Sequence, residues 1–344
     1  MSYSTIDKPT DFFNTKLYTG NASTQSITGV GFQPDLNWTK GRNVGTFHML
    51  TDAVRGATKV IQSNTTTAEQ TFASGLTSFD SDGFTAGNSD DINGNYNYAS
   101  WNWKANGAGS ANTDGSISST VSANSVSGFS IVKFTANGSN NGTIGHGLSS
   151  TPAIVIYKRL DGTGSWYVLY TFVDGSQDYL ILDSSSAKAD LASATYGTAT
   201  SSTISNIGFT NNHSMLAYCF ADVKGYSKFG SYTGNGNGNN ASNADGTFVY
   251  TGFKPAFFLV KSTGSFNWLM YDDKRDTINP NTSTFLADDG GAEYNTGRDV
   301  DFLSNGFKMR ANYNGNNASG VSFIYMVFAE NPFVGSNFVP NNAK

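Results

Sequence analysis

A unit of sequence that recurs three times constrains the fold of this chain more than any other feature. A proline stands six residues before a lysine at three places: Pro34 before Lys40, Pro152 before Lys158 and Pro255 before Lys261. Each proline leads into a strand-like run, and proline suits the first position of a strand because it cannot donate to a ladder. Self-similarity of this kind indicates a chain built from repeated structural modules.

Each unit carries further strand-like runs in the same order. One run opens the unit, a later turn leads into a Gly-Phe pair, and an apolar run closes it; the pairs are Gly83-Phe84, Gly208-Phe209 and Gly306-Phe307. About six short strands in roughly 100 residues, separated by Gly, Asn and Asp, are typical of a sandwich or barrel. We therefore predict an all-β chain of three tandem antiparallel β-sandwich modules, jelly-roll-like or lectin-like, related by internal repeat.

Composition places the module boundaries. Residues 106–125 are rich in Gly, Ser, Asn and Ala and hold no aromatic residue, which predicts a flexible linker. The expected division is module 1 at 1–105, the linker at 106–125, module 2 at 126–222, module 3 at 223–334 and a C-terminal tail at 335–344. The loop after the opening run varies in length between units, which predicts tolerant surface loops at 20–26, 137–142 and 234–246.

Charge and hydropathy exclude several classes of protein. The 344 residues include 21 basic and 26 acidic side chains, a net charge of −5, so no basic excess points to nucleic acid. The chain has no run of about 18 apolar residues, so the sequence predicts no membrane-spanning helix. The N-terminus lacks a charged segment followed by an apolar run, which predicts no signal peptide and synthesis in the cytoplasm. The single cysteine, Cys219, excludes an internal disulfide framework and suits core packing.

Catalytic side chains form no pattern that the units share. The three histidines occupy different places in their units, and none of Glu69, Glu293 and Glu330 has a counterpart in another unit. Adjacent residues of a strand face opposite ways, so Asp272 and Asp273 do not make the facing pair that a glycosidase needs. We predict no enzyme activity and no cofactor, with a carbohydrate-active enzyme as the less favoured alternative.

A cluster of aspartates resembles part of a calcium loop. Asp80, Asp82, Asp90 and Asp91 supply carboxylates of the type that calcium prefers, around Gly83. The matching slots of units two and three keep the turn glycine but hold Ser, Asn and Leu in place of the carboxylates. That comparison favours a tight turn and leaves the four aspartates as weak candidates for a metal site.

Contact with a glycan or a protein partner needs exposed polar or aromatic side chains. The candidates are Asn21, Asn137, Asn141, Asn235 and Asn239 in the variable loops, and Trp101 and Trp103 on one face of a strand-like run. For the two tryptophans burial in a core is the favoured interpretation. For Lys40, Lys158 and Lys261 the favoured interpretation is a solvated strand end that blunts a sheet edge, with anion binding as the alternative.

The first unit and the C-terminus resemble a known group of proteins. The strings are Gly31-Phe32-Gln33-Pro34-Asp35-Leu36 with Trp38 and Lys40, then Thr51-Asp52, Val54-Arg55-Gly56-Ala57-Thr58-Lys59, Ser81-Asp82-Gly83-Phe84, Trp101 with Trp103-Lys104-Ala105, and Phe328-Ala329-Glu330-Asn331-Pro332-Phe333. They are similar to structural proteins of marine tailed bacteriophages, found on tails, fibres or capsid surfaces. Unit two keeps only the repeat skeleton.

The resemblance implies a virion protein and carries over no catalytic residue. We expect a non-enzymatic structural protein exposed on the particle surface, a tail or fibre component in host attachment, with capsid decoration as the alternative. The expected partners are other virion proteins, further copies of the chain with a trimer favoured, and a host-surface glycan. Several copies of the chain in one oligomer would bind a partner more tightly than one copy, because their weak contacts act together.

Overall fold

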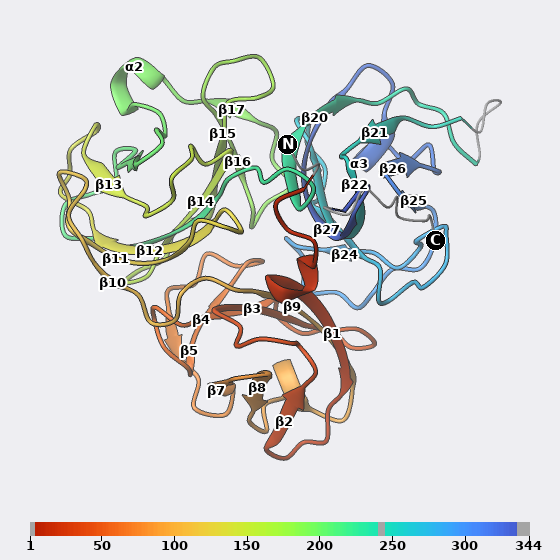
Figure 1. Ribbon diagram of the computed structural model, residues 1–344, viewed down its shortest axis with the longest axis horizontal. Helices are drawn as coiled ribbons and strands as arrows, with labels where there is room; N and C mark the ends of the chain where they lie inside the picture. The colour runs from red at the N-terminus through yellow and green to blue at the C-terminus, as the bar shows by residue number, and fades with distance from the viewer. Residues whose placement is uncertain (1–3, 240–244, 336–344) are drawn as a thin grey trace.

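The computed structural model describes residues 4–239 and 245–335, and its ribbon shows three lobes around a common centre (Figure 1). We call residues 13–103 the first lobe, residues 110–220 the second lobe and residues 227–332 the third lobe. Each lobe pairs one large antiparallel sheet with one small one. A short 3-10 helix, η1 (Pro9–Asp11), precedes the first lobe.

The first lobe has a six-stranded sheet in the order β1-β9-β3-β4-β5-β6 and a three-stranded sheet in the order β2-β8-β7. The bounds are β1 Phe13–Thr19, β2 Gln25–Thr28, β3 Leu36–Gly41, β4 Met49–Asp52, β5 Lys59–Gln62, β6 Gln70–Thr71, β7 Leu76–Asp80, β8 Gly83–Ala86, α1 Asp90–Asn93 and β9 Asn97–Trp103.

The second lobe has an eight-stranded sheet in the order β10-β11-β12-β19-β14-β15-β16-β17 and a two-stranded sheet of β13 and β18. The bounds are β10 Ser110–Asn112, β11 Ser119–Asn124, β12 Phe129–Thr135, β13 Thr143–Gly145, β14 Ile154–Arg159, β15 Tyr167–Tyr170, β16 Asp178–Ile181, β17 Ala189–Asp190, α2 Ser193–Tyr196, β18 Thr203–Ser205 and β19 Ser214–Phe220.

The third lobe has a five-stranded sheet in the order β20-β27-β22-β23-β24 and a three-stranded sheet in the order β21-β26-β25. The bounds are β20 Ser227–Thr233, β21 Phe248–Tyr250, β22 Phe253–Ser262, β23 Leu269–Asp272, β24 Phe285–Leu286, β25 Val300–Leu303, β26 Gly306–Met309, α3 Asn314–Asn317 and β27 Ser322–Pro332.

The prediction of an all-β chain of antiparallel sandwich type is confirmed. Each large sheet contains one run of five strands in the same arrangement: β1-β9-β3-β4-β5, β12-β19-β14-β15-β16 and β20-β27-β22-β23-β24. Pro34 and Pro152 lie just before β3 and β14, whereas Pro255 lies inside β22 at a shift of register. That the three lobes superpose as copies of one module stays a prediction.

The central strands of the large sheets, β9, β19 and β27, are buried on both faces. In β19, Leu216, Tyr218 and Phe220 point into a core that all three lobes share, while the alternate residues point into a core between the two sheets of the second lobe. Strand β27 divides its side chains between the shared core and the third lobe's own core in the same way. This agrees with the continuous apolar sequence of both strands, because such runs fit strands covered on both faces.

The shared core is built around Trp103. Its ring centroid lies 5.0 Å from that of Phe13, 6.5 Å from Phe220, 5.6 Å from Phe257 and 5.7 Å from Phe328. Trp101 and Trp103 are 0% and 2% exposed. Burial, the favoured interpretation of the sequence, is confirmed for both tryptophans, and their role as contact residues for a glycan or partner is excluded.

The prediction of a flexible linker at 106–125 is wrong. Residues 110–112 and 119–124 form β10 and β11, which extend the large sheet of the second lobe next to β12. Val121 packs into the core of that lobe and Ser122 accepts a hydrogen bond from the backbone of Asn106. Small polar residues predict a linker, but here they form β10, the exposed edge strand of the sheet, and β11, which lies between β10 and β12. The predicted tail at 335–344 lies outside the described residues except for residue 335.

Because the lobes share one core, we expect them to unfold together. Trp103→Ala should lower the free energy of unfolding by about 3–5 kcal/mol, the usual cost of truncating a buried aromatic ring. Urea unfolding followed by tryptophan fluorescence and by circular dichroism should give one transition, shifted as a whole. Ile278→Ala is the matched control, because Ile278 is 75% exposed. Separate transitions, of which the variant shifts one, would contradict a shared core.

Candidate functional site

Three ring nitrogens join the lobes into a closed ring. They belong to the residues that directly precede β4, β15 and β23, and each lies near a backbone oxygen of another lobe. His48 Nε2 lies 3.0 Å from the oxygen of Leu286, Trp166 Nε1 donates to Gln62 at 2.9 Å, and Trp268 Nε1 donates to Ile181 at 2.8 Å. The first lobe thus contacts the third, the second contacts the first, and the third contacts the second.

The lysines of the recurring unit are not at the surface. Lys40, Lys158 and Lys261 are buried, so the prediction of solvated strand ends is wrong. Lys158 Nζ donates to the carbonyl oxygen of Gly164 at 2.6 Å, and Lys261 Nζ to that of Gly264 at 2.8 Å. Lys40 Nζ reaches the carbonyl oxygen of Gly290 in the third lobe at 3.2 Å. Backbone oxygens of loops cover these ammonium groups. A strand pattern in the sequence does not reveal such a cover, because it shows only where the strand ends.

Burial governs the ionisation of these lysines. Removal from water disfavours the charged form and lowers the pKa of each lysine to about 8, although aspartates near each one act in the opposite direction. The ammonium groups therefore serve as buried donors to backbone oxygens and are closed to an external anion.

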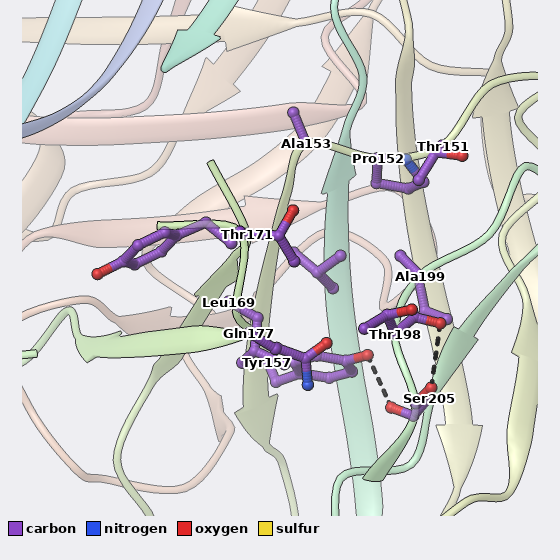
Figure 2. A pocket seen from close by; sticks show the side chains of 14 residues that line it. Thr151, Pro152, Ala153, Tyr157, Leu169, Thr171, Gln177, Thr198, Ala199 and Ser205 are labelled. Atoms are coloured by element: carbon purple, nitrogen blue, oxygen red, sulfur yellow. Dashed lines mark hydrogen bonds between the residues drawn. The ribbon is translucent and has the colours of Figure 1, made fainter. Parts of the chain in front are cut away.

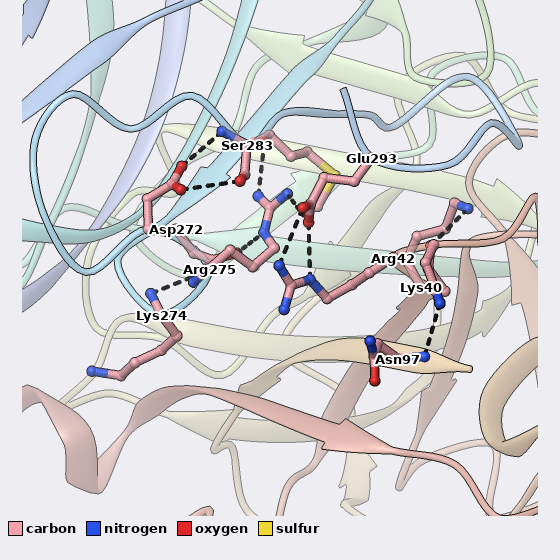
Figure 3. Close-up of polar contacts among 12 residues, drawn as sticks. Lys40, Arg42, Asn97, Asp272, Lys274, Arg275, Ser283 and Glu293 are labelled. Carbon is pink, nitrogen blue, oxygen red and sulfur yellow. Dashed lines mark hydrogen bonds and ion pairs between the residues drawn. The ribbon is translucent and has the colours of Figure 1, made fainter. Parts of the chain in front are cut away.

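A buried arginine joins two carboxylates between the third and first lobes. Arg275 Nε donates to Asp272 Oδ2 at 2.5 Å, and its Nη1 donates to Glu293 at 3.3 Å. Arg42 of the first lobe binds both oxygens of Glu293, at 3.0 and 3.1 Å, and Figure 3 shows the two arginines directed at this carboxylate. Trp101 Nε1 donates to Asp272 Oδ2 at 3.1 Å.

The same arrangement lies between the first and second lobes. Arg55 Nε donates to Asp52 Oδ2 at 2.5 Å, and its Nη1 lies 3.5 Å from Glu69. Tyr218 of the second lobe donates to Asp52 Oδ2 at 2.8 Å, as Trp101 does to Asp272. The sequence signal for these arginines is the spacing Asp-x-x-Arg, which stands twice in the chain.

These contacts define what the carboxylates singled out in the sequence do. The Arg275 guanidinium outweighs burial and holds the pKa of Asp272 below its usual range. Burial raises the pKa of Asp273 to about 6, although Lys274 pairs with it at 2.9 Å. Glu293 thus joins two lobes through its ion pair with Arg42, and Asp272 pairs with Arg275 of its own lobe. Glu69 pairs with Arg55 within the first lobe.

Three of the four aspartates of the candidate metal site have separate hydrogen-bond partners. Asp80 accepts from Ser78 and Thr85, each at 2.8 Å, and Asp82 accepts from the backbone of Gly29 and Gly31. Asp91 accepts from the backbone of Phe47 at 3.3 Å, and Asp90 is exposed in the first turn of α1. Within residues 4–239 and 245–335, no three His, Cys, Asp or Glu side chains form a group that could hold a metal ion.

The candidate asparagines begin the variable loops. The side-chain oxygens of Asn21, Asn137 and Asn235 each accept a hydrogen bond from the backbone two residues later, at 2.9, 3.0 and 3.0 Å. This is an Asx turn, and it fixes the start of each loop. Asn141 and Asn239 are also exposed; residues 240–244 of the third loop lie outside the described residues.

A second set of asparagines, missed in the sequence, holds these loops from below. Asn93, Asn206 and Asn317 are fully buried, and each side-chain amide donates to a backbone oxygen of the loop above it, at 2.5, 2.6 and 2.6 Å. The loops begin with similar strings, Thr19-Gly20-Asn21, Thr135-Ala136-Asn137 and Thr233-Gly234-Asn235, which is the signal that could have revealed a shared loop.

A cavity of about 280 Å³ opens on the second lobe, and Figure 2 shows side chains that line it. It lies against the outer face of the large sheet, at Tyr157 and Leu169, and extends to Ile204 and Ser205 of the small sheet. Tyr157 donates to the carbonyl oxygen of Ser205 at 2.8 Å and so fixes one wall. None of the residues that line the cavity carries a charge. This makes it the candidate binding site, distinct from the ion pairs between lobes.

Removal of one partner of the buried ion pair at Arg275 should destabilise the fold, because it leaves a buried charge unpaired. Arg275→Met leaves the buried carboxylate of Asp272 without its cation and should lower the free energy of unfolding by about 3–5 kcal/mol. Arg159→Met is the matched control, because its pair with Asp161 is partly exposed and should contribute at most about 1 kcal/mol. Urea unfolding measures both variants, and equal losses would contradict this role for Arg275.

The buried lysines should give stability a dependence on alkaline pH. The pKa of Lys158 falls from 10.5 to about 8 on folding, so between these values the unfolded chain binds more protons than the folded one. The free energy of unfolding therefore rises with pH through this group across that window. Lys158→Met should show a smaller rise than the unmodified chain in urea unfolding at pH 8 and pH 10. Lys8→Met, at an exposed site, should leave the rise unchanged; a Lys158→Met chain that behaves likewise would refute the assignment.

Comparison with known proteins gives a family and no activity. No curated protein and no solved structure matches the chain. Among the described residues, no helix is long and apolar enough to cross a membrane. The model of a domain of unknown function, DUF7483, matches residues 8–332, which take in all three lobes, and the chain therefore belongs to the DUF7483 family.

Proposed function

We propose that this chain is a non-enzymatic structural protein of a bacteriophage virion, exposed on the particle surface and acting in host attachment. The proposal rests on the resemblance of the first unit and the C-terminus to phage structural proteins. One structural observation supports it. Carboxylates and arginines that could act in catalysis are held in ion pairs at the boundaries between lobes, while polar loops and an uncharged cavity face outward.

A rigid body suits attachment. Three lobes on one core hold the starts of the loops, at Asn21, Asn137 and Asn235, in fixed positions, because a buried asparagine donates to a backbone oxygen two residues further on in each. Loops whose first residues are fixed lose less entropy when a partner binds.

Exposed aromatic residues favour contact with other virion proteins. Phe248 and Tyr250 are 45% and 47% exposed on β21, an outer strand of its sheet. Exposed aromatic side chains on an outer strand are typical of protein contact surfaces. We propose that the chain packs against other virion proteins and further copies of itself, a trimer being favoured. This surface would also serve the second candidate function, capsid decoration.

The attachment proposal predicts binding without cleavage. The purified chain should bind host cells saturably and compete with phage particles for adsorption, and it should release no reducing sugar from host polysaccharide. Quantitative mass spectrometry of intact particles should find it in the virion. Absence from the particle would refute a virion role, and presence without cell binding would favour decoration. Cleavage that Glu293→Gln abolishes without loss of stability would establish the enzyme alternative.

The assembly proposal has its own test. Light scattering of the purified chain should give the mass of an oligomer, and Phe248→Ser with Tyr250→Ser should reduce that mass. Thr247→Ala, next to these residues, is the control. A monomer at high concentration would contradict self-association.

A further inference from the structure

The cavity of the second lobe exists because a strand is missing there. In the first and third lobes, β7 and β25 add a third strand to the small sheet and place Leu76, Val300 and Phe302 in the core between the two sheets. In the second lobe the residues before β18 form α2 and a loop, and β18 pairs with β13 alone. The space that apolar side chains fill in the first and third lobes is therefore open in the second lobe.

The walls of this cavity combine an apolar floor with polar groups. Tyr157, Leu169 and Ile204 form the floor, and Thr171, Gln177 and Thr198 supply hydroxyl and amide groups around it (Figure 2). Binding sites for small molecules are typically apolar clefts with a few polar groups that fix the orientation of the ligand.

Gln177 is a polar group of the lining that lacks a partner. Its side chain lines the cavity and is 4% exposed, and among the described residues its Nε2 has no hydrogen-bond partner. A buried donor without a partner is costly, and native structures show few of them. An oxygen atom of a bound ligand would accept this hydrogen bond.

The lining also defines the charge of the ligand. It holds no Asp, Glu, Lys, Arg or His, so an ionic group would lose its water without gaining an opposite charge. A ligand with hydroxyl groups on one side and C–H groups on another matches both the polar groups and the floor. The volume of about 280 Å³ admits a single sugar ring.

We propose that this cavity binds a neutral sugar ring, supplied by a host-surface polysaccharide. The inference rests on the proposed attachment function and assigns its ligand class to one site. Gln177 donates to a ring hydroxyl or ether oxygen, and the floor contacts the C–H face of the sugar.

The direct test measures sugar binding by the full chain. Saturation-transfer NMR would use glucose, galactose, mannose and N-acetylglucosamine, with glucuronate as the charged comparison. We expect one or more neutral sugars to bind and glucuronate to bind more weakly. Ala199→Phe, which fills the cavity, should abolish the signal, and Gln177→Leu should weaken binding about tenfold, the effect of one lost hydrogen bond. Ser201→Phe places the same ring on an exposed neighbour outside the lining and should bind as the unmodified chain does.

The outcomes separate this inference from the attachment proposal. No binding of any neutral sugar tested, or binding that survives both Ala199→Phe and Gln177→Leu, overturns the cavity assignment. Host-cell binding that persists in those variants leaves attachment standing and overturns only the cavity as its site. Sugar binding at the cavity without any binding to host cells supports the cavity and overturns attachment. Circular dichroism confirms that each variant is folded, and Gln177→Leu keeps the test valid if Ala199→Phe fails to fold.

Discussion

Contact of aromatic rings around Trp103 is the interaction on which the rest of the structure depends. Phe13 comes from the first lobe, Phe220 from the second, and Phe257 and Phe328 from the third. Each large sheet has one face in this shared core, so no lobe completes its burial without the other two. Aromatic pairs contribute about 0.5–1.5 kcal/mol each beyond the area that they bury. The lobes are therefore parts of one cooperative body.

A core shared by three sheets requires the polar groups at its edges to be paired. Arg55 and Arg275 meet this need at two interfaces by joining carboxylates to each other and to a ring donor from the adjacent lobe. At the third interface Tyr170 ends β15 where Asp52 and Asp272 end β4 and β23, and its hydroxyl has no partner among the described residues. Buried ion pairs add little net stability but penalise misaligned interfaces strongly. Two charged interfaces and one uncharged interface thus fix which lobe meets which.

The sequence shows the alternation of apolar and polar residues along short segments, so it predicts strands but not the contacts between distant strands. The all-β class follows from short alternating runs, and the two buried faces of β19 and β27 follow from their continuous apolar residues. Which of two buried faces meets another lobe depends on contacts between distant segments, so the shared core around Trp103 has no local signal. For the same reason the sequence predicts that Lys158 lies at a solvated strand end, although a loop covers this side chain. Residues 106–125 read as a linker because small polar residues at a sheet edge look like those of a loop.

The second lobe departs from the other two in several connected ways. Its sequence keeps only the skeleton of the repeat, its small sheet lacks a third strand, and Val173 stands where Arg55 and Arg275 stand in the other lobes. Loss of the strand opens a space beside Tyr157, while the shared core on the opposite face of the same sheet is intact. A lobe held in place by its inner face can change its outer face without loss of the fold. Chain sections under the least structural constraint are where binding sites arise most readily, and in this molecule that section is the outer face of the second lobe.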